Sequence, residues 1–107
     1  MRIRFVDEAS LEFLDRVSYY GERRPELGRR FKEEVEQSIR WVAEHVEACR
    51  LRQGGYRRFN LRVFPYYIPY ITRGSTLWIL AIAHTRQKPE YWIQREPTAN
   101  EASLDEM

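Results

Sequence analysis

The first half of the chain carries apolar residues at the three- and four-residue steps typical of amphipathic helices. The stronger pattern lasts about five turns and predicts a long helix between residues 27 and 46. Its inner positions are Leu27, Phe31, Val35, Ser38, Ile39, Val42 and Val46. An earlier apolar stripe of Phe13, Leu14, Val17 and Tyr20 predicts a first helix, which Asp7 can cap. Because Gly21 and Pro25 leave only a short connection, we expect an antiparallel helical hairpin.

The second half of the chain changes to the two-residue period of β-strands. Residues 56–63 alternate between an apolar face and a mostly basic face, the latter formed by Tyr56, Arg58, Asn60 and Arg62. Residues 66–72 and the nearly all-apolar segment 76–84 predict two more strands, and residues 2–6 a short first strand. We therefore predict an α+β domain. A small twisted four-stranded sheet joins the first strand to a three-stranded antiparallel meander, with two helices on one face and the basic face open.

The segment FPYYIPY, residues 64–70, combines four aromatic residues with two prolines. Pro65 fits a turn or the start of a strand, whereas Pro69 lacks the N–H of a ladder residue and is expected at an edge or a bulge. This placement predicts that the segment borders solvent or a partner. The tyrosines favour packing on the sheet over a ligand site.

The composition indicates one domain. The chain has 107 residues, 43% of them hydrophobic, and we assign residues 1–95 to the domain and residues 96–107 to an acidic tail. It has no apolar run long enough to span a membrane and no apolar stretch of a signal peptide at its start, so we expect a cytoplasmic protein without a membrane partner. One cysteine, two histidines and no acidic cluster beside them predict no disulfide, no metal and no cofactor.

The charges are unevenly distributed along the chain. Residues 7–47 hold eleven acids and seven bases, whereas residues 48–95 hold nine bases and a single acid, Glu90. A half-molecule this basic is expected to attract a polyanion or an acidic protein surface.

The acidic tail carries four acids, no base and no apolar periodicity, so we expect it to be disordered. Deleting residues 97–107 should therefore leave the melting temperature nearly unchanged, as measured by circular dichroism during thermal unfolding. A large drop would show that the tail docks on the domain.

The segments RRFNLRVFPYYIPY and LWILAIAHTRQKPEYWIQR, following a helical hairpin, resemble the RelE/ParE superfamily of bacterial type II toxin–antitoxin toxins, also called plasmid stabilization proteins. The resemblance covers residues 2–95 and is carried by FPY.I.Y and AH.R..P.YW..R in this order and spacing. It implies a small four-stranded antiparallel sheet with two N-terminal helices. It also implies an acidic antitoxin that wraps the toxin in a hetero-oligomer.

The RelE branch of this superfamily cleaves messenger RNA on the ribosome, which requires a proton acceptor, a proton donor and cations around the phosphate. On this reading Arg86 and Arg58 would stabilise the phosphate charge, and His84 or Tyr91 would transfer the proton. The set is incomplete, because Asn60, Tyr67 and Trp92 stand where the resemblance implies a lysine, an arginine and a tyrosine. A structural interpretation of His84 is that it ends a strand and fixes the next loop through backbone hydrogen bonds.

The ParE branch instead poisons DNA gyrase by binding and performs no chemistry. We prefer this branch, because lost cations would slow phosphoryl chemistry by orders of magnitude. The residues expected to contact the target or the antitoxin are Arg58, Arg62, Tyr67, Arg86, Trp41 and Arg95. The alternatives are the ribonuclease and a non-toxic relative that only binds a partner.

Overall fold

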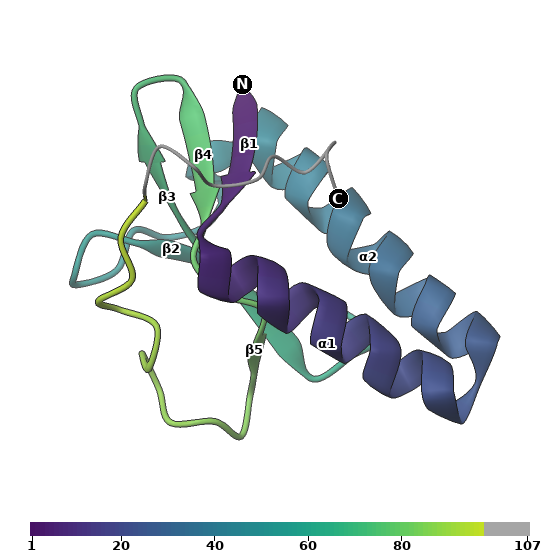
Figure 1. Ribbon diagram of the computed structural model, residues 1–107. Coiled ribbons are helices and arrows are strands. Elements are labelled where there is room, and N and C mark those ends of the chain that lie inside the picture. Colours follow the sequence, from purple (N-terminus) through teal and green to yellow (C-terminus); the bar gives the residue numbers. More distant parts are fainter. Residues whose placement is uncertain (98–107) are drawn as a thin grey trace.

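The computed structural model describes residues 1–97, which form an α+β domain with a helical layer on one face of a β-sheet (Figure 1). The helices are α1 (Asp7–Arg23) and α2 (Pro25–Glu44), followed by a 3-10 helix at Val46–Ala48. The strands are β1 (Arg2–Phe5), β2 (Arg57–Asn60), β3 (Tyr66–Arg73), β4 (Thr76–Ile79) and β5 (Ala83–His84). The predicted fold class and order of elements are confirmed. The acidic tail lies outside the described residues from position 98 onward.

The two helices approach each other closely near the turn that joins them. Gly28 of α2 is buried, and a Cβ atom at this position would lie 2.7 Å from the Cα atom of Gly21 in α1. Glycine at position 28 therefore lets the two backbones touch. Pro25 opens α2, where its fixed φ suits the first turn and its missing N–H has no helical partner to lose.

Two details of α1 differ from the prediction. The N-cap residue is Val6, and Asp7 is already helical, where its negative charge favours the N-terminal end of the helix dipole. Leu14 is exposed, because the buried stripe follows Ala9 and Phe13. At about 100° per residue, Leu14 lies a quarter turn away from that stripe.

The sheet is mixed, with the strand order β1-β4-β3-β2 and β5 paired to β3. β2, β3 and β4 form the predicted antiparallel meander, and β1 joins the same sheet as predicted. β1 runs parallel to β4, however, so the sheet is not wholly antiparallel. The parallel pairing follows from the helical hairpin, which returns the chain to the sheet through a long crossover.

A bulge interrupts the strand that the apolar run 76–84 predicts. Tyr70 pairs with Ile79, but Tyr67 pairs with Ala83, so the three residues 80–82 lie opposite only two residues of β3. Pro69 lies at this break, as predicted, and its carbonyl accepts the N–H of Leu80 at 2.9 Å. The expectation that the segment borders solvent is wrong. Residues 66–70 are buried, because β3 is central and has neighbours on both sides.

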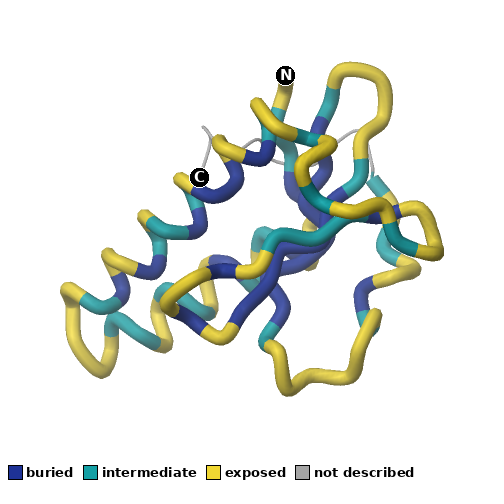
Figure 2. Tube along the Cα trace, turned by 180° about the vertical axis from the view of Figure 1, so that it is seen from behind, coloured by how far each residue is buried: buried dark blue, intermediate teal, exposed yellow. Residues whose placement is uncertain are grey.

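The sheet face opposite the helices is not open, because the C-terminal segment crosses it. Trp92 is fully buried, and its ring packs edge-on against Tyr56 with the ring centroids 4.6 Å apart. Its Nε1–H donates to the Tyr67 hydroxyl at 3.1 Å. Figure 2 shows the buried positions concentrated along the central strands, between the helices and this segment.

Candidate functional site

The sheet lies between two members of the predicted ribonuclease set, Arg58 and His84. Arg58 pairs with Pro69, and its guanidinium lies 4.2 Å from the ring centroid of Tyr67, on the face that Trp92 covers. His84 pairs instead with Tyr66. Successive strand residues point to opposite faces, and the two partners, Tyr66 and Pro69, are three residues apart in β3. His84 therefore lies on the helix-covered face and Arg58 on the other. The structure therefore does not bring these two residues to a common phosphate.

His84 ends β5 and holds the following loop through backbone contacts, as the structural interpretation predicts. Its Nδ1 accepts the backbone N–H of Arg86 at 3.0 Å, and its own N–H donates to the Gln87 side-chain oxygen at 2.9 Å. Its ring packs edge-on against Tyr66, with the centroids 4.9 Å apart. The Arg86 residue itself is exposed.

Glu12 of α1 gathers the C-terminal segment into an internal network. Its carboxylate accepts both terminal nitrogens of Arg95, Nη1 at 3.0 Å and Nη2 at 2.9 Å. It also accepts the Tyr91 hydroxyl at 2.7 Å and the N–H of Ile82 at 3.1 Å. The Arg95 and Glu12 side chains are only 15% and 14% exposed. This network fixes the segment from Tyr91 to Arg95 against α1.

The network changes the protonation chemistry of its members. Burial, together with the hydrogen bond to Glu12, raises the pKa of Tyr91, so its hydroxyl stays protonated and donates. Burial alone would lower the pKa of Arg95, but the hydrogen bond and charge of Glu12 produce a net rise. Tyr91 is therefore held as a donor to Glu12 and does not serve as a base.

Two residues predicted to contact a partner lie inside the domain. Arg95 is bound to Glu12, and Tyr67 is buried between Arg58 and Trp92. Sequence reasoning missed Glu12, because one acid among eleven in the helical half gives no distinguishing signal. The partner of Arg95 is 83 positions away in the chain.

A groove with an apolar lining lies between α2 and the turn after β2. Its volume is about 380 Å³, and it is lined by Glu34, Gln37, Ser38, Trp41, Phe59, Arg62 and Val63. Trp41 is exposed, and its ring packs at 5.6 Å from the Phe59 ring centroid. Val63 was predicted on the buried face but is 65% exposed. The reason is that β2 ends at Asn60, and Glu34 Oε2 accepts the backbone N–H groups of Arg62 and Val63 at 2.7 and 3.3 Å.

The outer edge of β2 lies beside this groove. The backbone N–H of Leu61 donates to Tyr66 O at 2.9 Å. The backbone N–H and C=O groups of the alternate residues Phe59 and Arg57 therefore also point toward β3. Arg58 and Asn60 then direct their backbone groups away from the sheet. β2 is the last strand in the sheet order, so no described strand pairs with this outer edge. Trp41, Val63, Arg62 and this strand edge together form what we call the α2–β2 surface.

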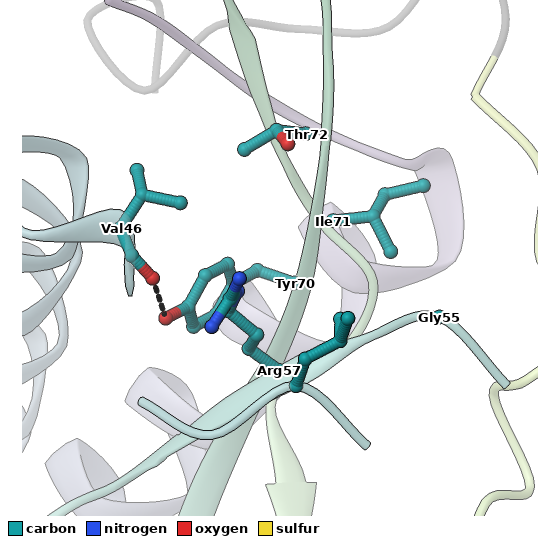
Figure 3. Close-up of a pocket in the computed structure, with 7 residues that line it drawn as sticks. Val46, Gly55, Arg57, Tyr70, Ile71 and Thr72 are labelled. Carbon is teal, nitrogen blue, oxygen red and sulfur yellow. Dashed lines mark hydrogen bonds between the residues drawn. The ribbon is translucent and has the colours of Figure 1, made fainter. Parts of the chain in front are cut away.

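A second cavity, of about 250 Å³, lies where the 3-10 helix meets the start of β2 (Figure 3). The Tyr70 hydroxyl donates to Val46 O at 2.9 Å, and Arg57 Nη1 donates to Cys49 O at 2.6 Å. Burial, with a smaller effect from Cys49, raises the pKa of Tyr70. Both polar side chains therefore serve the fold, and the cavity offers no free catalytic group among them.

Within residues 1–97 no cluster of three metal-binding side chains occurs. None of the described helices is long and apolar enough to cross a membrane.

Comparison with known proteins gives a consistent result. Residues 3–89 match the family model described as the ParE toxin of type II toxin-antitoxin system, parDE. The chain is similar in fold to a solved structure titled "Chromosomal ParDE TA system from P. aeruginosa", with a TM-score of 0.68 and 18% sequence identity. The alignment covers 78% of this chain and 95% of that chain. No curated protein matches the sequence.

Proposed function

The chain belongs to the ParE toxin family of type II toxin–antitoxin systems, and we propose that it stops growth by binding DNA gyrase rather than by cleaving RNA. The gyrase target is implied by the family. We propose that the protein acts in the cytoplasm, where gyrase binds DNA.

The observation that carries the proposal is the placement of Arg58 and His84 on opposite faces of the sheet. Cleavage by the ribose 2′-OH needs a base and a cation within hydrogen-bonding reach of the same phosphate. Tyr91 does not replace His84, because its hydroxyl is bound to Glu12. Arg58 is thus separated from His84, so the predicted ribonuclease set does not meet at one phosphate.

Neutralisation by a ParD antitoxin follows from the family, and we propose the α2–β2 surface as its binding site. The groove offers Trp41 and Val63 as apolar contacts, Arg62 as a cation at its rim and an unpaired strand edge. An extended, acidic and partly apolar segment of the antitoxin fits all three features. It would add a strand at the edge of β2 and fold as it binds.

The function is tested with the purified toxin and its cognate antitoxin. The toxin alone should inhibit supercoiling of plasmid DNA by gyrase, and the antitoxin should restore it. Messenger RNA on translating ribosomes should remain intact in the presence of the toxin. Cleaved messenger RNA together with unaffected gyrase would reject the proposal in favour of the ribonuclease.

Arg86→Ala separates the two mechanisms by the size of its effect. An exposed cation contributes about 0.2 to 1 kcal/mol to a contact, so gyrase inhibition should weaken by about fivefold or less. A cation that stabilises the transition state of phosphoryl chemistry would be worth about 10²- to 10³-fold. Dose–response curves for growth arrest and for supercoiling measure the difference. Arg29→Ala, at an exposed position on α2, is the matched control.

A further inference from the structure

A separate cavity of about 280 Å³ lies between α1 and the end of β5, outside the α2–β2 surface. It is lined by Asp15, Arg16, Tyr19, Tyr20, Tyr66 and His84. The two sites are built on different elements, since α2 and β2 form the surface already described and α1, β3 and β5 form this one. We call it the α1–β5 notch.

The notch contains a mostly buried cation whose carboxylate partner, Asp15, lies exposed at the rim. The Arg16 side chain is 15% exposed, the same fraction as that of Arg95. Arg95 has the bidentate carboxylate of Glu12, whereas Arg16 Nη2 donates to the neutral Gln87 side chain at 3.1 Å. Its Nη1 lies 3.5 Å from Asp15, whose side chain is 79% exposed and hydrated. Arg16 Nε is buried without a partner in the described part of the chain.

Such an arrangement is costly unless something else completes it. A mostly buried cation is stable when a carboxylate and further hydrogen bonds satisfy its donors. Glu12 lies one turn away on α1, but Arg95 and Tyr91 already occupy its oxygens. Arg16 thus retains donor capacity that the described domain does not use.

Two further side chains of the notch, His84 and Tyr66, carry polar hydrogens. His84 Nδ1 accepts the Arg86 N–H, so in the neutral ring the proton lies on Nε2. Burial, followed by the hydrogen bond to Tyr20, raises the pKa of Tyr66 to about 12, and its hydroxyl is protonated at neutral pH. A guanidinium, an imidazole N–H and a phenol therefore meet around one small cavity.

The charge balance favours a monoanion. Arg16 supplies one permanent positive charge, His84 adds none while its Nδ1 accepts the Arg86 N–H, and the Asp15 carboxylate lies at the rim. A dianionic phosphate would meet Asp15 with twice the repulsion of a carboxylate. The helix α1, which forms one wall of the notch, also exposes the apolar side chains of Leu11, Leu14 and Tyr19. These features match an acidic side chain set among apolar residues of a peptide.

Building on the proposed neutralisation by an antitoxin, we propose that the α1–β5 notch binds a single Asp or Glu side chain of the antitoxin, with the carboxylate on Arg16. The exposed apolar residues of α1 hold the flanking residues of the same segment. The antitoxin then contacts the helical hairpin on the α1 side as well as at the α2–β2 surface.

The small-molecule test uses the toxin alone. Propionate, a monoanion that mimics one acidic side chain, is titrated at constant ionic strength while nuclear magnetic resonance follows the Arg16 Nε–H and His84 ring signals, with inorganic phosphate as the second arm. Saturable shifts with propionate are expected, and the His84 shifts should disappear in Arg16→Gln but persist in Arg29→Gln. Three results would overturn the proposal that the notch binds a carboxylate: saturable binding of phosphate alone, shifts that survive Arg16→Gln, or no saturable shift.

The antitoxin test measures affinity for the intact partner. Losing one member of a buried, hydrogen-bonded charge pair should weaken binding by about 30-fold or more in Arg16→Gln. Arg29→Gln should change it by about fivefold or less. Amide spectra of both variants establish that they fold. Equal affinities for the two variants would reject the antitoxin as occupant. Gyrase inhibition by the free toxin is assayed separately. If gyrase is not the target, the measured antitoxin affinities still test the notch.

Discussion

Glu12→Gln should lower the free energy of unfolding by about 3 kcal/mol, one of the largest effects available from a single near-isosteric change in this chain. The substitution keeps the volume and an acceptor oxygen but removes the negative charge beside Arg95. The Arg95 guanidinium, only 15% exposed, is then left without its counter-ion. Denaturant unfolding followed by tryptophan fluorescence measures the loss, because Trp92 reports on the segment that Glu12 holds.

Two further variants identify the cause of this loss. Glu33→Gln removes the same charge from an exposed position on α2 and should change stability by about 0.5 kcal/mol or less. Adding Arg95→Met to Glu12→Gln removes the stranded cation and should recover part of the stability, giving a favourable coupling in the double-mutant cycle. If Glu12→Gln is as mild as Glu33→Gln, the network does not hold the C-terminal segment.

The sequence predicts those parts of the fold that depend on local periodicity. The spacing from Leu27 to Val42 specifies α2, and Pro25 at its first position specifies the turn of the hairpin. The Glu12–Arg95 contact has no such local signal, because each residue alone looks like an ordinary surface charge. Only the packing of the C-terminal segment across the sheet brings them together.

The bulge after β4 explains why the candidate site was harder to predict. An uninterrupted strand over 76–84 would continue the register of Tyr70 with Ile79 and place His84 opposite Pro65, on the face of Arg58. One extra residue shifts the pairing, so His84 lies opposite Tyr66 on the helix-covered face. Because the residues of this run are apolar on both faces, the sequence contains no alternation that would reveal the shift. The predicted catalytic set was therefore separated by a single inserted residue.

The double variant Trp41→Ala/Val63→Asp should weaken antitoxin binding by at least about 100-fold, because it removes an aromatic contact and places a charge in the apolar groove. Val63 is 65% exposed in the free toxin, so the aspartate is hydrated until a partner covers it. Isothermal titration of the purified proteins measures the affinity. In cells, co-expressed antitoxin should no longer restore growth.

The matched control for this surface is Leu51→Asp, which places the same charge at another exposed apolar residue outside the groove. Its affinity for the antitoxin should stay within about fivefold of the original. Both toxins should still inhibit gyrase when the antitoxin is absent, which separates loss of neutralisation from loss of the fold. If the antitoxin neutralises the double variant as well as it neutralises Leu51→Asp, it binds elsewhere, and the strand edge of β2 is then not its docking site.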